Sequence, residues 1–319
     1  MRIKNKLISI FIGLIIVILF FASITFAEKV TYISMGSGGI GGTYYPIGGG
    51  MCELLNKYIP NMMATSEVTG ASLQNVIMVA NNECQVAQAN ASAVYLGYRG
   101  MEPFKEKYNV SSMFNMHPSH IHFMALKSSG IKSIKDFKGK IVCVGPPGGT
   151  TFVSAYDIMA AAGITEDDIK PSYLNMTEGI SALKDGIIDA IVISCSVPNP
   201  ATMELTSTED VSFFPVDEET FTKLFSKFPY YFKDKIEKGS YKGLEEDIPC
   251  VIVWNIVICN PNLDVDLVYQ MTKVWFEHVD YLIKVHPICR YMILDRATDV
   301  PCPMHPGAEK YFREMGVIK

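Results

Sequence analysis

Apolar and polar stretches alternate along most of the chain in the order typical of strands and helices. Short apolar runs predict strands at residues 30–35, 65–68 and 85–89, and the segments opening near Pro46, Ser72 and Ser92 carry apolar side chains at helical spacing. The pattern restarts after residue 131, with strands expected at 140–144, 171–174 and 188–194 and helices at 151–162 and 177–184. This alternation predicts an α/β fold with mostly parallel sheets flanked by helices.

Two apolar stretches, residues 122–126 and 250–259, interrupt this order, and the second is long for a strand confined to one small lobe. A long helix is expected from residue 264 to about 286. The pattern indicates two lobes joined by a two-segment hinge. The first lobe would hold residues 28–122 plus 251–319 and the second residues 123–250, with crossings near 120–127 and 248–258.

Residues 1–27 have the composition of a secretory signal peptide. Arg2, Lys4 and Lys6 precede an apolar run over residues 7–21, and small residues lead up to Ala27. This order predicts a cleavable signal and a mature protein in the periplasm or another extracytoplasmic compartment. An uncleaved anchor is the alternative, because the run is about long enough to span a bilayer.

Charge and cysteine content narrow the class further. Without the three basic residues of the signal, 25 Lys and Arg stand against 33 Asp and Glu, a net charge of −8. A binder of nucleic acid or anionic membrane would have the opposite balance. Of eight cysteines, several lie in apolar runs, and none forms a CxxC pair. Cys289 and Cys302 are the pair best suited to a disulfide in an exported protein.

Two glycine-rich loops, at residues 36–46 and 145–151, each follow a predicted strand and lead into a helix. Ligands of open α/β sheets bind beyond the carboxyl ends of strands, where glycines allow close approach of the backbone. The free N–H groups of a helix start suit a carboxylate, and the hydroxyls of Thr43, Thr150 and Thr151 add donors. Further polar side chains fall at equivalent strand ends: Ser72, Asn75, Gln88 and Asn90.

Other chemistries find less support. The glycines Gly36, Gly38 and Gly41 match a dinucleotide-binding fingerprint, but the expected helix starts several residues too late for it. Three histidines at residues 117, 120 and 122 lack the further ligands of a metal site, so we interpret them as ordinary strand and loop residues. GxSxG and HExxH motifs are also missing, and we therefore expect neither an enzyme nor a cofactor.

Five motifs resemble the TAXI family, the extracytoplasmic solute receptors associated with TRAP transporters. They are GTYYP at residues 42–46, TGASLQN at 69–75, the segment 131–151 with GKIVCVGPPGGT, DGIIDA at 185–190 and HPGAEKYFRE at 305–314. The resemblance runs through the whole chain after the signal, in order. It implies a two-lobed type 2 periplasmic-binding-protein fold and a monomer that delivers glutamate, glutamine or a dicarboxylate-like anion to a TRAP permease. A sensor that presents its ligand to a receptor kinase is the alternative.

Carried over by position, the resemblance implies a binding site formed by Ser37, Thr43, Tyr44, Ser72, Asn75, Gln88, Asn90, Gly149, Thr150 and Thr151. Two positions depart from the family pattern. Asn90 stands where family members usually have Asp, which removes a negative charge from the expected site, and Gly149 stands where Ser is common. Both departures bear on the identity of the ligand.

Overall fold

The structure is a computed structural model that describes residues 30–40, 42–147 and 149–318. The predicted signal peptide lies outside these residues. The fold described below lies in one compact unit, Tyr32–Lys319, apart from Thr31 at the start of its first strand. None of the helices in the described ranges has the length and apolar character needed to cross a membrane.

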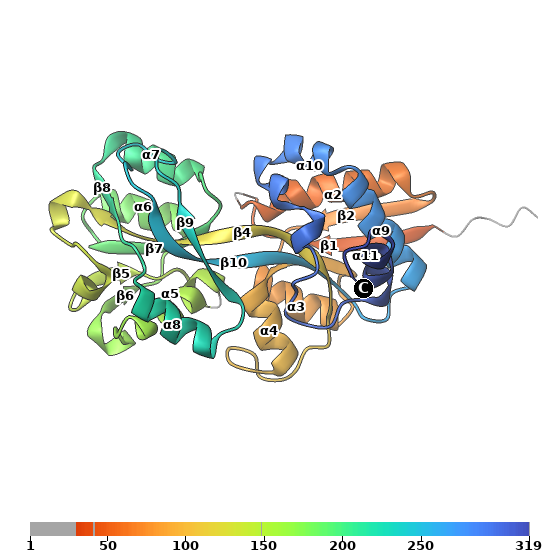
Figure 1. The fold of residues 1–319 in the computed structure, drawn as a ribbon, viewed down its shortest axis with the longest axis horizontal. Coiled ribbons are helices and arrows are strands. Elements are labelled where there is room, and N and C mark those ends of the chain that lie inside the picture. Colours follow the sequence, from red (N-terminus) through yellow and green to blue (C-terminus); the bar gives the residue numbers. More distant parts are fainter. Residues whose placement is uncertain (1–29, 41, 148, 319) are drawn as a thin grey trace, which may run out of the picture. The chain divides into compact units, whose positions relative to one another are not determined.

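Ten strands of the described chain form one mixed sheet (Figure 1). The main path runs in the order β2-β1-β3-β10-β4-β7-β5-β6, while β8 pairs with β4 and β9 with β10. We call β1 to β3 the first half of the sheet and β5 to β7 the second half. The strands are β1 (Thr31–Gly36), β2 (Met62–Glu67), β3 (Val86–Asn90), β4 (Ser111–Leu126), β5 (Ile141–Cys143), β6 (Lys170–Ser172), β7 (Ala190–Cys195), β8 (Val211–Phe213), β9 (Tyr231–Ile236) and β10 (Ile248–Cys259).

The two longest strands, β4 and β10, connect the halves. β10 is antiparallel to β3 on one side and to β4 on the other, and β4 is also antiparallel to β7. The predicted strand at 122–126 is therefore only the last part of β4, which begins eleven residues earlier. The sequence pattern does not indicate the beginning of β4, because polar side chains and Pro118 interrupt the apolar run there. The lobe boundaries given above stay a prediction.

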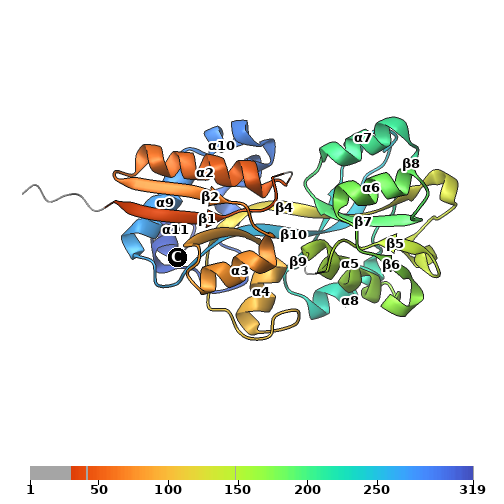
Figure 2. The same ribbon diagram turned by 180° about the vertical axis from the view of Figure 1, so that it is seen from behind.

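Ten helices flank the sheet in the described residues (Figures 1 and 2). Those around the first half are α2 (Tyr44–Tyr58), α3 (Ser72–Ala80), α4 (Ala91–Arg99), α9 (Val265–Glu277), α10 (Val279–Val285) and α11 (Pro306–Glu314). Those around the second half are α5 (Thr150–Ala161), α6 (Met176–Lys184), α7 (Pro200–Thr208) and α8 (Glu218–Lys227). The predicted α/β class is confirmed.

One predicted helix is wrong in detail. The segment from 264 to 286 is not continuous but divides into α9 and α10 at His278, whose backbone leaves the helical region at φ −121° and ψ 28°. The ring of His278 stacks on Tyr58 of α2 with ring centroids 3.8 Å apart. The break lets α10 turn across α2, and a regular apolar pattern in the sequence gives no sign of it.

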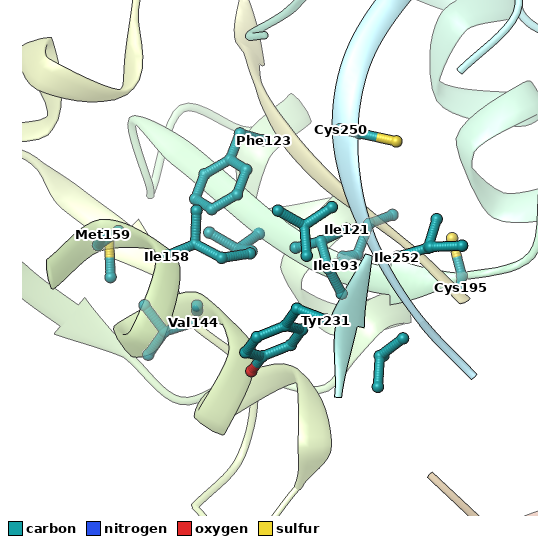
Figure 3. Packing of buried hydrophobic residues seen from close by; sticks show 14 of the residues in the cluster. Ile121, Phe123, Val144, Ile158, Met159, Ile193, Cys195, Tyr231, Cys250 and Ile252 are labelled. Carbon is teal, nitrogen blue, oxygen red and sulfur yellow. The ribbon is translucent and has the colours of Figure 1, made fainter. Parts of the chain in front are cut away.

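The buried side chains form two clusters. One packs α2, α9 and α11 on the first half of the sheet around Trp275, Phe114 and Phe312. The other centres on the second half, where Phe123, Ile158 and Ile193 meet (Figure 3), and it also includes residues of α3 and α4. The two clusters therefore do not coincide with the two halves of the sheet, because β3, α3 and α4 contribute to the second cluster and β4 and β10 contribute to both.

All eight cysteines are free and buried. The expected Cys289–Cys302 disulfide is therefore wrong in this structure, and the Cys302 Sγ instead lies 3.0 Å from the hydroxyl of Ser112. Burial raises the pKa of Cys289 to about 12 and that of Cys302 to about 11. These thiols act as small apolar groups of the core.

Candidate functional site

A cavity of about 240 Å³, which we call the polar cavity, lies where both halves of the sheet meet the central strands. Its walls come from the loop after β1, the end of β7, the middle of β4 and β10, and the starts of several helices. The lining residues are Gly38, Gly39, Gly42, Thr43, Tyr44, Ala71, Ser72, Asn90, His117, Ser119, Thr150, Met176, Ser194, Cys195, Ser196, Asn199 and Asn255. None of these lining residues is Lys, Arg, Asp or Glu.

Six of the described helices begin at this cavity. The first residues or N-caps of α2, α3 and α4 line it from one half, and those of α5, α6 and α7 line it from the other. The start of each helix carries a partial positive charge and N–H groups without partners inside the helix. Six such ends around one small volume make it favourable for an anion, although no cationic side chain lines it.

The six helix starts fall into two sets. Asn90, Asn175 and Asn199 cap α4, α6 and α7, each accepting a hydrogen bond from an N–H of the first turn. No side chain caps α2, α3 or α5. The uncapped helices α2 and α5 follow the two glycine-rich loops, and they face the cavity from opposite halves. The first N–H groups of α5 are therefore left for a bound ligand, whereas in α2 the N–H of Tyr45 donates to the Gly42 carbonyl oxygen and Pro46 has no N–H, which leaves that of Tyr44.

A hydrogen-bonded chain crosses the floor of the polar cavity. The hydroxyl of Tyr44 donates to Asn255 Oδ1 and lies 3.4 Å from Ser72 Oγ, which accepts the backbone N–H of Asn90 at 3.0 Å. Asn255 Nδ2 donates in turn to Ser119 Oγ at 2.8 Å. Burial raises the pKa of Tyr44 well above its ordinary value, so the phenol stays neutral. These hydrogen bonds hold the Tyr44 side chain between α2 and β10.

His117 also lines this floor, and only 1% of its surface is exposed. Its Nδ1 lies 3.2 Å from Asn255 Nδ2 and 3.3 Å from the Pro118 carbonyl oxygen, whereas its Nε2 is buried without a hydrogen-bond partner in the described chain. Desolvation lowers the pKa of His117 to about 4, so the imidazole is neutral at pH 7. A neutral ring with one unused nitrogen can contact a ligand.

Half of the predicted site residues line the cavity, namely Thr43, Tyr44, Ser72, Asn90 and Thr150. Gly149 is the N-cap of α5, and Thr151 lines an adjoining cavity of about 40 Å³.

The other three predicted residues, Ser37, Asn75 and Gln88, lie behind the cavity wall. Asn75 Nδ2 donates to the carbonyl oxygens of Ser37 and Gln88, both at 2.7 Å. The hydroxyl of Ser37 donates to the carbonyl oxygen of Glu67 at 2.6 Å, and the amide of Gln88 donates to that of Tyr44 at 2.7 Å. These side chains hold the glycine-rich loop against the neighbouring strands. Their predicted contact with a ligand would be indirect.

Sequence reasoning missed the part of the wall formed by β4, β10 and the loop after β7. Asn255 is a lone amide inside the apolar run 250–259, and Ser194, Ser196 and Asn199 surround the end of a predicted strand. Both are usable signals, because a buried polar side chain inside a strand has to find a partner. Neither stretch is rich in glycine, and glycine was the feature that marked the predicted loops.

One pair of residues at the cavity has the composition of a catalytic dyad. Cys195 Sγ lies 3.7 Å from His122 Nδ1, and His122 Nε2 lies 3.1 Å from the hydroxyl of Tyr241. Burial raises the pKa of Cys195 and lowers that of His122 to about 3, so both side chains are neutral at pH 7. The attacking species of cysteine chemistry is the thiolate, which this environment disfavours. In the described residues no group of three His, Cys, Asp or Glu could hold a metal ion.

A larger cavity, of about 710 Å³, lies between β9, β10 and the segment near Arg296. It contains charges of both signs, including Lys233, Asp234 and Asp299 as well as Arg296. Two short 3-10 helices, Pro287–Tyr291 and Leu294–Arg296, contribute to its wall, and neither glycine-rich loop reaches it. We therefore take the polar cavity as the candidate site, since the predicted loops and the helix starts meet there.

Comparison with known proteins assigns the family. The chain belongs to the NMT1-like family, whose model matches residues 35–316. Among solved structures it is similar to the periplasmic sulfonate-binding protein SsuA from Methylobacillus flagellatus KT, with 14% identity, a TM-score of 0.51 and coverage of 92% of this chain and 89% of that one.

A protein of Bordetella bronchiseptica RB50 gives 15% identity, a TM-score of 0.50 and coverage of 92% and 90%. A substrate-binding protein of an ABC uptake transporter from Streptococcus pneumoniae, solved with bound histidine, gives 17% identity, a TM-score of 0.49 and coverage of 84% of this chain and 95% of that one. At these identities the likeness shows the fold alone, which is that of periplasmic solute-binding proteins.

Proposed function

We propose that this protein is an extracytoplasmic solute receptor that captures a small organic anion in the polar cavity and delivers it to a membrane transporter. The observation that carries this proposal is the meeting of six helix starts from both halves of the sheet around one uncharged cavity. The similarity to a periplasmic sulfonate-binding protein supports it at the level of the fold. The signal-like sequence of residues 1–27 supports export.

Neutral donors would hold the anion. The N–H groups at the starts of α2, α3 and α5 and the hydroxyls of Thr43, Ser72 and Thr150 are the groups available. A hydrogen bond to a charged group contributes about 1.5–3 kcal/mol. Three or four such bonds together contribute about 4.5–12 kcal/mol, a range that includes the roughly 8 kcal/mol of micromolar affinity, without a salt bridge.

We propose that the two halves close on the ligand. The uncapped helices α2 and α3 lie on one side of the cavity and α5 on the other, so an anion bound by donors from both sides would favour approach of the two halves. β4 and β10 are the connections that would bend. Small-angle scattering with and without a tightly bound ligand should show a smaller radius of gyration in the bound protein, and identical profiles would count against closure.

The binding test is a titration of the mature chain with defined anions. Isothermal titration with methanesulfonate, succinate, 2-oxoglutarate and L-glutamate should give saturable one-to-one binding for at least one of them. A ligand at 100 times its dissociation constant stabilises the fold by about 2.7 kcal/mol, so thermal unfolding gives an independent readout. Failure of every compound in both assays would refute the receptor proposal.

The transporter is proposed to be a TRAP permease, on the basis of the TAXI-like motifs such as GTYYP at residues 42–46. The sulfonate-binding and histidine-bound neighbours are named as parts of ABC systems, which use ATP. Uptake measured in membrane vesicles distinguishes the two. A TRAP permease would respond to an ion gradient without ATP, whereas uptake that depends on ATP would overturn this part of the proposal.

A further inference from the structure

We propose that the polar cavity selects organic anions that carry no ammonium group, and so discriminates against α-amino acids. This inference rests on the proposed function and specifies its ligand class. Three observations lead to it: the polarity of two buried amides, the absence of carboxylates from the described lining, and the orientation of six helix starts.

Asn90 presents a donor to the cavity, and the protein itself fixes this orientation. Its Oδ1 accepts the backbone N–H of Ser92 at 3.2 Å and the hydroxyl of Ser92 at 2.7 Å. Because Oδ1 is engaged on the helix, Nδ2 occupies the other position of the amide. Asn90 is 1% exposed and lines the cavity. The side chain therefore offers the ligand an N–H group and not an oxygen.

Asn199 repeats this arrangement on the opposite wall. Its Oδ1 accepts the backbone N–H of Thr202 at 3.2 Å as the cap of α7, which leaves Nδ2 as the free group. Asn199 is 7% exposed and lines the cavity. Two buried amides, one from each half of the sheet, thus present an N–H donor to the polar cavity.

An ammonium group would find little compensation here. The described lining residues include no Asp or Glu, and the partial charges of six helix starts are positive. An ammonium moved from water into such a site loses its hydration without gaining a carboxylate partner. Sulfonates, keto acids and dicarboxylates avoid this cost, because all their charge is negative.

Matched pairs of ligands that differ mainly in an ammonium group test the inference. Suitable pairs are 2-oxoglutarate with L-glutamate, succinate with L-aspartate, and ethanesulfonate with taurine, each titrated calorimetrically against the mature chain at pH 7.5. In every pair that binds, the member without the ammonium should bind at least about tenfold more tightly, which corresponds to one lost charged hydrogen bond. Equal or tighter binding of the amino compound overturns the inference and leaves the receptor proposal standing. Absence of binding in all pairs overturns the receptor proposal, and the inference with it.

Three variants assign the discrimination to residues. Asn90→Asp and Asn199→Asp place a carboxylate in the cavity and preserve the helix cap, since Asp caps as well as Asn. Asn175→Asp is the matched control: it makes the same change at the cap of α6, on an exposed side chain that does not line the cavity. Either cavity variant should reduce the preference by about tenfold or reverse it, while the control keeps the wild-type ratio. Unchanged ratios in both cavity variants would refute the assignment.

Discussion

His117 makes the stability of the fold depend on pH in a way that can be calculated. Its pKa is lowered from 6.5 to about 4 by burial, so in the folded protein it takes up a proton less readily than in the unfolded chain. Between pH 6.5 and 4 the unfolded chain binds more protons, and stability therefore falls as pH falls through this window. From pH 7.5 to pH 5 the two pKa values give a loss of about 2 kcal/mol from this residue alone.

The assay is urea unfolding of the wild type and of His117→Gln at pH 7.5 and pH 5. Glutamine cannot titrate, so the wild type should lose about 2 kcal/mol more than the variant between the two pH values. His122, whose pKa is lowered to about 3, contributes in the same direction in both proteins and cancels in the comparison. Proton NMR of the His117 ring should independently give a midpoint near pH 4. An equal loss of stability in the two proteins would refute the depressed pKa and the buried, neutral imidazole.

Three further predictions concern packing, charge and the loop. A Cβ at Gly307 would lie 2.8 Å from a backbone nitrogen of α9, so Gly307→Ala should destabilise the fold by about 3 kcal/mol or more. Gly49 has open space around it, so Gly49→Ala should stabilise α2 by about 0.5–1 kcal/mol. Chemical denaturation measures both changes. Burial raises the pKa of Asp157 to about 6, so its charged form lowers stability as pH rises from 4 to 6, and Asp157→Asn should gain about 1–3 kcal/mol at pH 7.5 in the same assay. Asn75→Ala should lower the free energy of unfolding by about 2–4 kcal/mol, because it removes two buried hydrogen bonds. Thr43→Ala should keep the melting temperature of the wild type and bind the ligand about tenfold more weakly, as measured by calorimetry.

The order of strands and helices could be predicted because most elements bury only one face or one stripe, which leaves a periodic pattern. β4 is different, since almost every residue from Ser111 to Ala125 is buried, polar ones included. Asn115 and His117 are accommodated there by hydrogen bonds to distant segments, as with the two bonds from Asn115 Nδ2 to the carbonyl oxygens of Arg296 and Asp299. The partners of Asn115 are 181 and 184 residues away and that of His117 is 138 residues away, and no local pattern indicates them.

In the candidate site too, features with a local sequence pattern could be predicted and those set by tertiary contacts could not. The glycine-rich loops mark α2 and α5 in the sequence, because an uncapped helix start that follows a run of glycines has a local signature. Asn75 and Gln88 have polar side chains near strand ends, as the lining residues do, yet their side chains hold the backbone of the loop before α2. Whether a polar side chain at a strand end faces a ligand or a carbonyl oxygen depends on which loop packs over it. That choice is made by tertiary packing.

In the proposed receptor, the distribution of caps around the polar cavity would link ligand binding to movement of the two halves. The asparagine-capped helices α4, α6 and α7 satisfy an N–H of their first turn internally, so their contribution to the cavity is mainly the helix dipole and the side-chain amide of Asn90 or Asn199. The uncapped helices α2, α3 and α5 need an outside acceptor, which is water when the cavity is empty. One anion can replace that water on both sides only if the two walls lie within hydrogen-bond distance of it. If the proposed closure takes place, the free energy of binding is gained largely in the closed state, which is the condition for a ligand to shift the population towards it. The proposed receptor would signal occupancy by its shape, without any cationic side chain among the described lining residues.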